Sequence, residues 1–88
     1  MNSGLMFGPS MLPSMGRVNF VWLEPFDFIT VGDVVCFTRK NKIGRLIHRV
    51  IDIDAQGKVY IKGDNAPEVD CVSLSEIFSK VAKFRKLL

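Results

Sequence analysis

The stretch "VVCFTRKNKIGRLIHRVIDID", residues 34–54, has the pattern of two β-strands. It contains two runs rich in β-branched and aromatic residues, 34–39 and 45–54, separated by the polar, glycine-containing segment "KNKIG". Runs of this composition bounded by turn residues are typical of β-strands. We therefore predict two strands joined by a turn at 40–44.

Successive side chains of a strand point to opposite faces, which divides the second run into two sets. The predicted sets are Leu46, His48, Val50 and, at the end, Asp52 on one face, and Ile47, Arg49, Ile51 and Ile53 on the other. The chain's one histidine thus lies among apolar neighbours. Such a histidine is usually a core or surface residue, and it is also a candidate base.

The segments on either side extend the β pattern. "AQGK", residues 55–58, reads as a hairpin turn into "VYIKGDN", and "RVNFVWL", residues 17–23, reads as a further strand. The opening residues 1–7 read as irregular, and Gly8, Pro9 and Pro13 place Ser10 on a loop. Short turns between strands predict a mainly β, antiparallel domain.

The segment "SLSEIFSKVAKF", residues 73–84, is ambiguous. Ser73 and Glu76 have the spacing of a capping box, and the apolar residues that follow have helical spacing. Taken alone, the segment predicts a helix.

Composition limits the functions to be considered. The 88 residues suit one domain, 1–88, and the net charge of +3 is spread along the chain, which does not favour nucleic-acid binding. No apolar run is long enough to span a bilayer, so we expect a soluble or membrane-peripheral chain. Cys36 and Cys71 lack metal-site spacing and are predicted to be buried free thiols; no cofactor and no metal are expected.

Ser10 and the acidic segment "KGDNAPEVD", residues 62–70, are the remaining candidates for chemistry. A serine between prolines is usually a turn residue, and a nucleophilic serine requires a base within reach. Asp64 and Asn65 fit a tight turn, whereas a catalytic interpretation makes Asp64 or Asp70 the carboxylate that orients the histidine. The residues alone leave both interpretations open.

Five segments in order resemble the conserved boxes of type I signal peptidases and related serine proteases, over about Phe7 to Ala82. They are "GPSMLP" (8–13), "VGDVVCF" (31–37), "LIHRVI" (46–51), "YIKGDNAPEVD" (60–70) and "SEIFSKV" (75–81). Histidine in the third box is similar to the archaeal and endoplasmic-reticulum members, since most bacterial members have lysine there.

The resemblance implies a small signal-peptidase-like β-barrel or half-barrel and a serine endopeptidase that cleaves signal peptides or a specific precursor after small residues. Ser10 would be the nucleophile and His48 the general base, with Asp64 and Asp70 both at positions of important acids. The Ser10 N–H is the expected oxyanion donor. Met11 and Leu12 are expected to line shallow substrate pockets.

The resemblance also bears on the partners and on the C-terminal segment. Family members carry a transmembrane helix just before the serine box, where this chain has seven residues, so a membrane-anchored partner joins the polypeptide substrate as an expected partner. The family has a turn and then a strand where "SEIFSKVAKF" stands, so we predict a turn at 74–77 followed by a strand. The alternative function is a non-catalytic peptide- or protein-binding module on the same fold.

Overall fold

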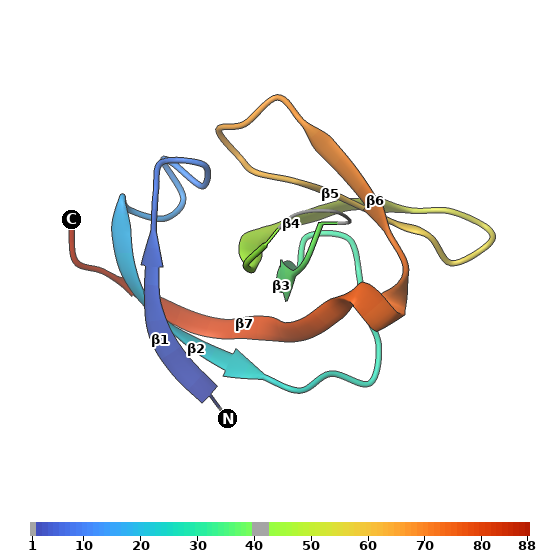
Figure 1. Cartoon of the computed structure of the whole chain (residues 1–88), viewed down its shortest axis with the longest axis horizontal. Coiled ribbons are helices and arrows are strands. Elements are labelled where there is room, and N and C mark those ends of the chain that lie inside the picture. The colour runs from blue at the N-terminus through green and yellow to red at the C-terminus, as the bar shows by residue number, and fades with distance from the viewer. Residues whose placement is uncertain (1, 40–42) are drawn as a thin grey trace.

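The computed structural model describes residues 2–39 and 43–88. The chain forms one antiparallel sheet of seven strands, in the order β1-β2-β7-β3-β4-β5-β6 (Figure 1). The elements are β1 (Asn2–Phe7), β2 (Val18–Glu24), β3 (Val34–Phe37), β4 (Leu46–Ile53), β5 (Val59–Lys62), β6 (Val69–Val72), a 3-10 turn η1 (Leu74–Glu76) and β7 (Ile77–Lys86). The mainly β fold with a short helical turn near the C-terminus is confirmed.

The sheet is curved and open. Figure 1 shows it curling around the interior, with β1 and β6 as its two edges. The C-terminal strand β7 lies between β2 and β3 and pairs with both, so it joins the N-terminal hairpin to the remaining strands. This topology gives a half-barrel rather than a closed barrel.

The two strands predicted within residues 34–54 pair with each other as β3 and β4, with Val35 opposite His48 and Phe37 opposite Leu46. Residues 40–42 of the predicted "KNKIG" turn lie outside the described residues. The hairpin turn at 55–58 is confirmed, since the Asp54 N–H donates to the Lys58 carbonyl at 3.0 Å.

A β-bulge in β4 corrects the predicted division of its faces. Val50 pairs with Ile61 and Asp52 pairs with Tyr60, so Ile51 is an extra residue in β4. A bulge reverses the alternation beyond it. The prediction that Ile53 and Val50 lie on opposite faces is therefore wrong: Leu46 and Ile53 both pack against the core cluster that contains Val50.

The predicted turn and strand at the C-terminus are confirmed by η1 and β7. Within the capping box, the Ser73 N–H donates to Glu76 Oε1 at 3.0 Å, and the turn ends at once, with Ile77 in an extended conformation. The strand β7 that follows is ten residues long and pairs with both β2 and β3. Two inter-strand ladders therefore override the local helical periodicity.

Two strands were missed. Residues 1–7 were predicted to be irregular, but Asn2–Phe7 forms β1, which pairs with β2. Val69–Val72 forms β6 at the other edge.

The prediction that Cys71 is buried is also wrong: Asp70 and Val72 point inward, so Cys71 points outward and is exposed, whereas Cys36 on β3 is buried.

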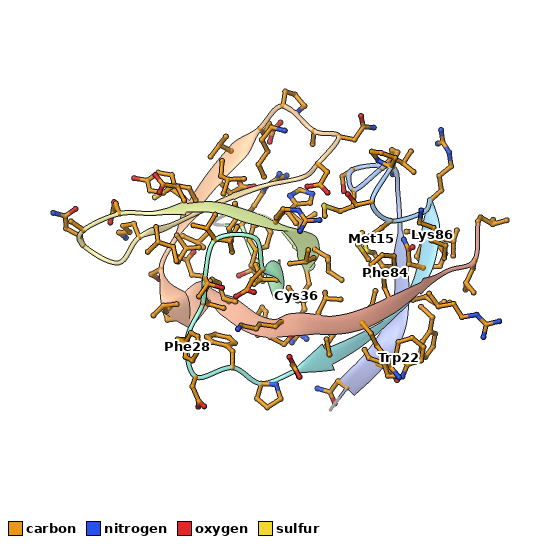
Figure 2. All side chains as sticks on the ribbon, turned by 180° about the vertical axis from the view of Figure 1, so that it is seen from behind. Met15, Trp22, Phe28, Cys36, Phe84 and Lys86 are labelled. Atoms are coloured by element: carbon orange, nitrogen blue, oxygen red, sulfur yellow. The ribbon has the colours of Figure 1, made fainter. Side chains whose placement is uncertain are left out.

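The hydrophobic core consists of two clusters, whose residues come from the strands and from the loops between them. The larger comprises Ile29, Val35, Phe37, Val50, Val59, Ile61, Val72 and Ile77, and the smaller comprises Met6, Met11, Met15 and Val21. Outside this core, Trp22 lies on the outer side of the sheet, where Lys83 Nζ is 4.6 Å from its ring centroid (Figure 2). None of the helical structure in the described ranges is long and apolar enough to cross a membrane.

Candidate active site

The loop that carries Ser10 joins β1 to β2 and is anchored at both ends. Gly8 has a φ of 112°, a conformation that L side chains rarely adopt, and its N–H donates to the Arg17 carbonyl at 2.8 Å. Met11 and Met15 are buried in the smaller core cluster. Ser10 lies between these anchors and is half-buried, so its position is fixed by the packing of its neighbours.

This loop rests on the turn after β5, which begins at Gly63. The Ala66 N–H donates to the Gly63 carbonyl at 3.1 Å and closes the turn. From the turn, the Asn65 N–H donates to the Ser10 carbonyl at 2.7 Å, and Asn65 Nδ2 donates to the Pro9 carbonyl at 3.2 Å. The "GDN" segment therefore holds the backbone of the serine in place.

His48, on β4, lies where the Ser10 loop contacts the turn at Gly63. Its side chain is almost completely buried, and its ring centroid is 5.8 Å from that of Phe37. Ser10 and His48 line one cavity of about 270 Å³ together with Arg39, Leu46, Ala66, Pro67 and Glu68. The structure thus brings together two residues that are distant in the sequence and that the motifs paired.

The serine and the histidine are neighbours without a direct bond. Among the described residues, no hydrogen bond joins Ser10 Oγ to His48, and His48 Nδ1 is buried without a partner. Catalytic hydrogen bonds are often long in a free enzyme and tighten when substrate binds. The arrangement therefore places a serine hydroxyl and an imidazole at one cavity.

The environment of His48 favours the neutral imidazole. Burial is the main reason that the pKa of His48 is lowered from its ordinary value of 6.5, and the positive charge of Arg39 acts in the same direction. The carboxylates of Asp70, Asp64 and Glu68 oppose this shift. A neutral imidazole at pH 7 is the form that can accept a proton.

Asp64 is bound by an arginine and a serine rather than by the histidine. Arg49 Nε and Nη2 donate to its two carboxylate oxygens, both at 3.0 Å, and Ser14 Oγ donates to Oδ2 at 2.6 Å. The hydrogen bonds from Arg49 lower the pKa of Asp64 and outweigh its partial burial. Asp64 holds the turn in place through Arg49, the next residue after His48.

Asp70 is likewise paired with an arginine. Arg39 Nε donates to its Oδ1 at 2.8 Å, and Arg39 Nη2 lies 3.4 Å from Glu68 Oε2. The other oxygen, Asp70 Oδ2, is buried and has no partner among the described residues. Neither predicted acid therefore bonds His48 here, and no motif in the sequence indicated Arg39.

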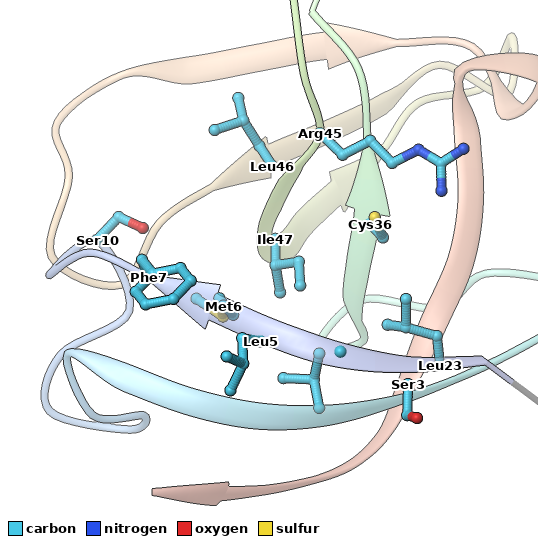
Figure 3. A pocket seen from close by; sticks show the side chains of 12 residues that line it. Ser3, Leu5, Met6, Phe7, Ser10, Leu23, Cys36, Arg45, Leu46 and Ile47 are labelled. Carbon is cyan, nitrogen blue, oxygen red and sulfur yellow. The ribbon is translucent and has the colours of Figure 1, made fainter. Parts of the chain in front are cut away.

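A groove runs along β1 and ends at Ser10. It has a volume of about 410 Å³, and Figure 3 shows Leu5 and Phe7 on one side of it and Arg45 and Ile47 on the other. Because β1 is an edge strand of the described sheet, its outward backbone N–H and C=O groups are not paired with another strand.

The two residues predicted to line substrate pockets lie elsewhere. Met11 is fully buried in the core, so its side chain is closed to a substrate in this conformation. Leu12 is half-buried, and neither residue is among those that line the groove or the cavity of Ser10. The groove is lined in part by side chains of β1, which the sequence did not indicate.

Over residues 2–39 and 43–88, no three histidine, cysteine, aspartate or glutamate side chains gather as a metal site would require. Comparison with known proteins found no matching family model, no matching curated protein and no matching solved structure.

Proposed function

We propose that this chain is a serine endopeptidase in which Ser10 is the nucleophile and His48 the general base. The observation that carries the proposal is the cavity that the two residues share, built where the serine loop contacts the turn at Gly63. The lowered pKa of His48 supports it, because a base must be unprotonated at the working pH. The order of the sequence boxes supports the same assignment.

The proposed reaction is acyl transfer. His48 takes the proton of Ser10, and the alkoxide attacks the peptide carbonyl to give a tetrahedral intermediate. His48 then gives the proton to the leaving amine. Water, activated by the same imidazole, hydrolyses the acyl-enzyme and frees Ser10. Asp64 and Asp70 act on His48 through their charge, since both are bonded to arginines.

The oxyanion needs donors that are not already engaged. The Ser10 N–H is the donor we propose; Pro9 has no N–H, and the Gly8 N–H already donates to the Arg17 carbonyl. Removing one oxyanion donor typically costs about 100- to 1,000-fold in rate.

The proposed substrate is an extended polypeptide, either a signal peptide or a specific protein precursor cleaved after a small residue. An edge strand beside the nucleophile suits such a substrate, because added-strand binding uses backbone groups that every peptide has. The groove along β1 supplies contacts for alternate side chains. A membrane-anchored protein is the proposed second partner.

Cleavage of a defined peptide library tests this function. The library consists of unstructured 12-residue peptides with alanine, glycine or serine at one central position, and mass spectrometry maps the new termini. We expect cleavage on the carboxyl side of the small residue. Products that are equally abundant with heat-denatured protein would overturn the proposal.

The pH dependence of the reaction follows from the lowered pKa of His48. A base is lost when it is protonated, so kcat/KM should stay level near pH 7 and fall as the pH drops through a value below 6.5. The measurement is kcat/KM from pH 4.5 to 8.5 at constant ionic strength. An acid limb centred above 6.5, or a rate independent of pH, would contradict the role of His48.

A peptide-binding module is the second candidate, favoured by the absence of a bond between Ser10 and His48 among the described residues and by the pairing of both acids with arginines. It predicts that the library peptides bind without being cleaved. Isothermal titration and mass spectrometry on the same samples distinguish the two functions.

A further inference from the structure

Arg39 connects the end of β3 to β6 across the candidate active site. It follows β3 by two residues, and its guanidinium pairs with Asp70 at 2.8 Å and with Glu68 at 3.4 Å. Its side chain is three-quarters buried and lines the cavity that Ser10 and His48 share. A surface arginine that only stabilised a strand edge would not need to lie beside the histidine.

Two buried polar atoms near Arg39 have no hydrogen-bond partner within the described part of the chain. They are His48 Nδ1 and Asp70 Oδ2. Buried polar atoms in proteins are nearly always paired, so two such atoms in one site call for an explanation. The guanidinium occupies the other oxygen of Asp70 and holds this carboxylate in an ion pair rather than on the imidazole.

The charges that face His48 affect how readily its imidazole is protonated. Carboxylates come from Asp64 on the turn after β5, from Glu68 before β6 and from Asp70 on β6; the neighbouring Ser10 is neutral. Arg49 neutralises Asp64, and Arg39 is the cation that offsets the other two. Carboxylates near a buried imidazole favour its protonated form.

We propose that Arg39 is a positioning residue of the active site, which holds Asp70 and Glu68 in an ion-pair cluster beside His48 and thereby keeps the imidazole free to act as base. The inference rests on the proposed function for its consequence in catalysis. The effect of Arg39 on the imidazole does not depend on whether the chain cleaves peptides. Arg39 lowers the pKa of His48 by its charge, whereas Asp70 and Glu68 raise it.

The test is a titration of the one histidine of the chain by NMR, which needs no substrate and no assignment among several imidazoles. In Arg39→Met, no cation offsets the negative charges of Asp70 and Glu68. The titration midpoint of His48 should therefore move to higher pH. In Arg39→Lys, the retained cation should keep it near the wild-type value. In Asp70→Asn, one carboxylate is lost, so the midpoint should move to lower pH.

Arg85→Met is the matched control, because it removes one positive charge from the exposed end of β7. We expect its midpoint to equal that of the wild type. The kcat/KM acid limb should follow the same order, so that the ratio of activity at pH 6 to that at pH 8 falls at least about threefold in Arg39→Met. A purely structural role of Arg39 would lower activity equally at both pH values.

The outcomes separate the inference from the proposed function. A midpoint in Arg39→Met that equals or lies below the wild-type value overturns the inference, whether or not the chain cleaves peptides. If Arg39→Met does not fold, Asp70→Asn decides in its place, and an unchanged or higher midpoint overturns the inference. Midpoints that move as expected in a chain that cleaves nothing overturn the proposed function alone.

Discussion

Replacing Ser10 with alanine should abolish peptide cleavage and leave the fold unchanged. The substitution removes the hydroxyl that we propose to form the covalent bond to the substrate, and loss of a serine nucleophile typically costs about 10⁴-fold or more in kcat. The hydroxyl makes no hydrogen bond with the other described residues, whereas the Ser10 carbonyl, which the turn holds, is retained. The measurement combines library cleavage with thermal unfolding of the same samples.

The matched control is Ser75→Ala, in the 3-10 turn η1 and outside the cavity of Ser10. It should cleave like the wild type. If Ser10→Ala cleaves the same bonds at a comparable rate, Ser10 is not the nucleophile. If it remains folded and still binds the peptides, the groove along β1 binds substrate independently of the chemistry.

The second large effect is expected from Gly63→Ala, because Gly63 is where the serine loop, the histidine and the turn meet. A Cβ atom at Gly63 would lie 2.7 Å from the Ser10 carbonyl oxygen and 3.1 Å from His48 Cδ2. The oxygen belongs to the backbone, so the serine loop must move to admit the methyl group. Displacing a reacting group by about 1 Å costs on the order of 100-fold in rate, and overpacking costs about 1–3 kcal/mol of stability.

Library cleavage and chemical denaturation measure the two effects. Gly4→Ala is the control for stability, since no atom outside residues 3–5 lies within 4 Å of the Cβ it would add. Its free energy of unfolding should stay within about 0.5 kcal/mol of the wild type. A Gly63→Ala variant with unchanged activity and stability would show that the loop does not rest on the turn as described.

The sequence predicted those strands whose pattern is local. β4 and the hairpin after it follow from alternating apolar residues and turn residues, which need no knowledge of the partner strand. β1 could not be predicted in this way, because its six residues become a strand only by pairing with β2. β6 is similar: it is short, begins within the acidic segment 62–70 soon after Pro67, and takes its register from β5.

The sequence indicated several residues of the candidate site but not which of them contact one another. The order of the motifs indicated Ser10 and His48, and the fold places both at one cavity. Spacing does not tell which cation a carboxylate will meet, so the pairing of Asp70 with Arg39 was missed. The inward position of Met11 was also missed, because a loop between prolines gives no periodicity from which to infer burial.

The strand β7 illustrates the limit of periodicity. Its residues have helical spacing, and only the resemblance to a known family indicated a strand. The structure explains the difference, because β7 fills the position between β2 and β3 and completes two hydrogen-bonded ladders there. A helix in that place would leave both neighbours with unpaired backbone groups.

Ser10 and His48 are proposed to act as one catalytic unit, and a double-mutant cycle on kcat/KM tests this proposal. Ser10→Ala, His48→Ala and the variant with both changes are compared on one cleaved library peptide at pH 7.5. Residues of one catalytic unit are strongly non-additive. We therefore predict that the double variant loses no more activity than either single variant. Losses that multiply, or a His48→Ala variant that cleaves like the wild type, would contradict it.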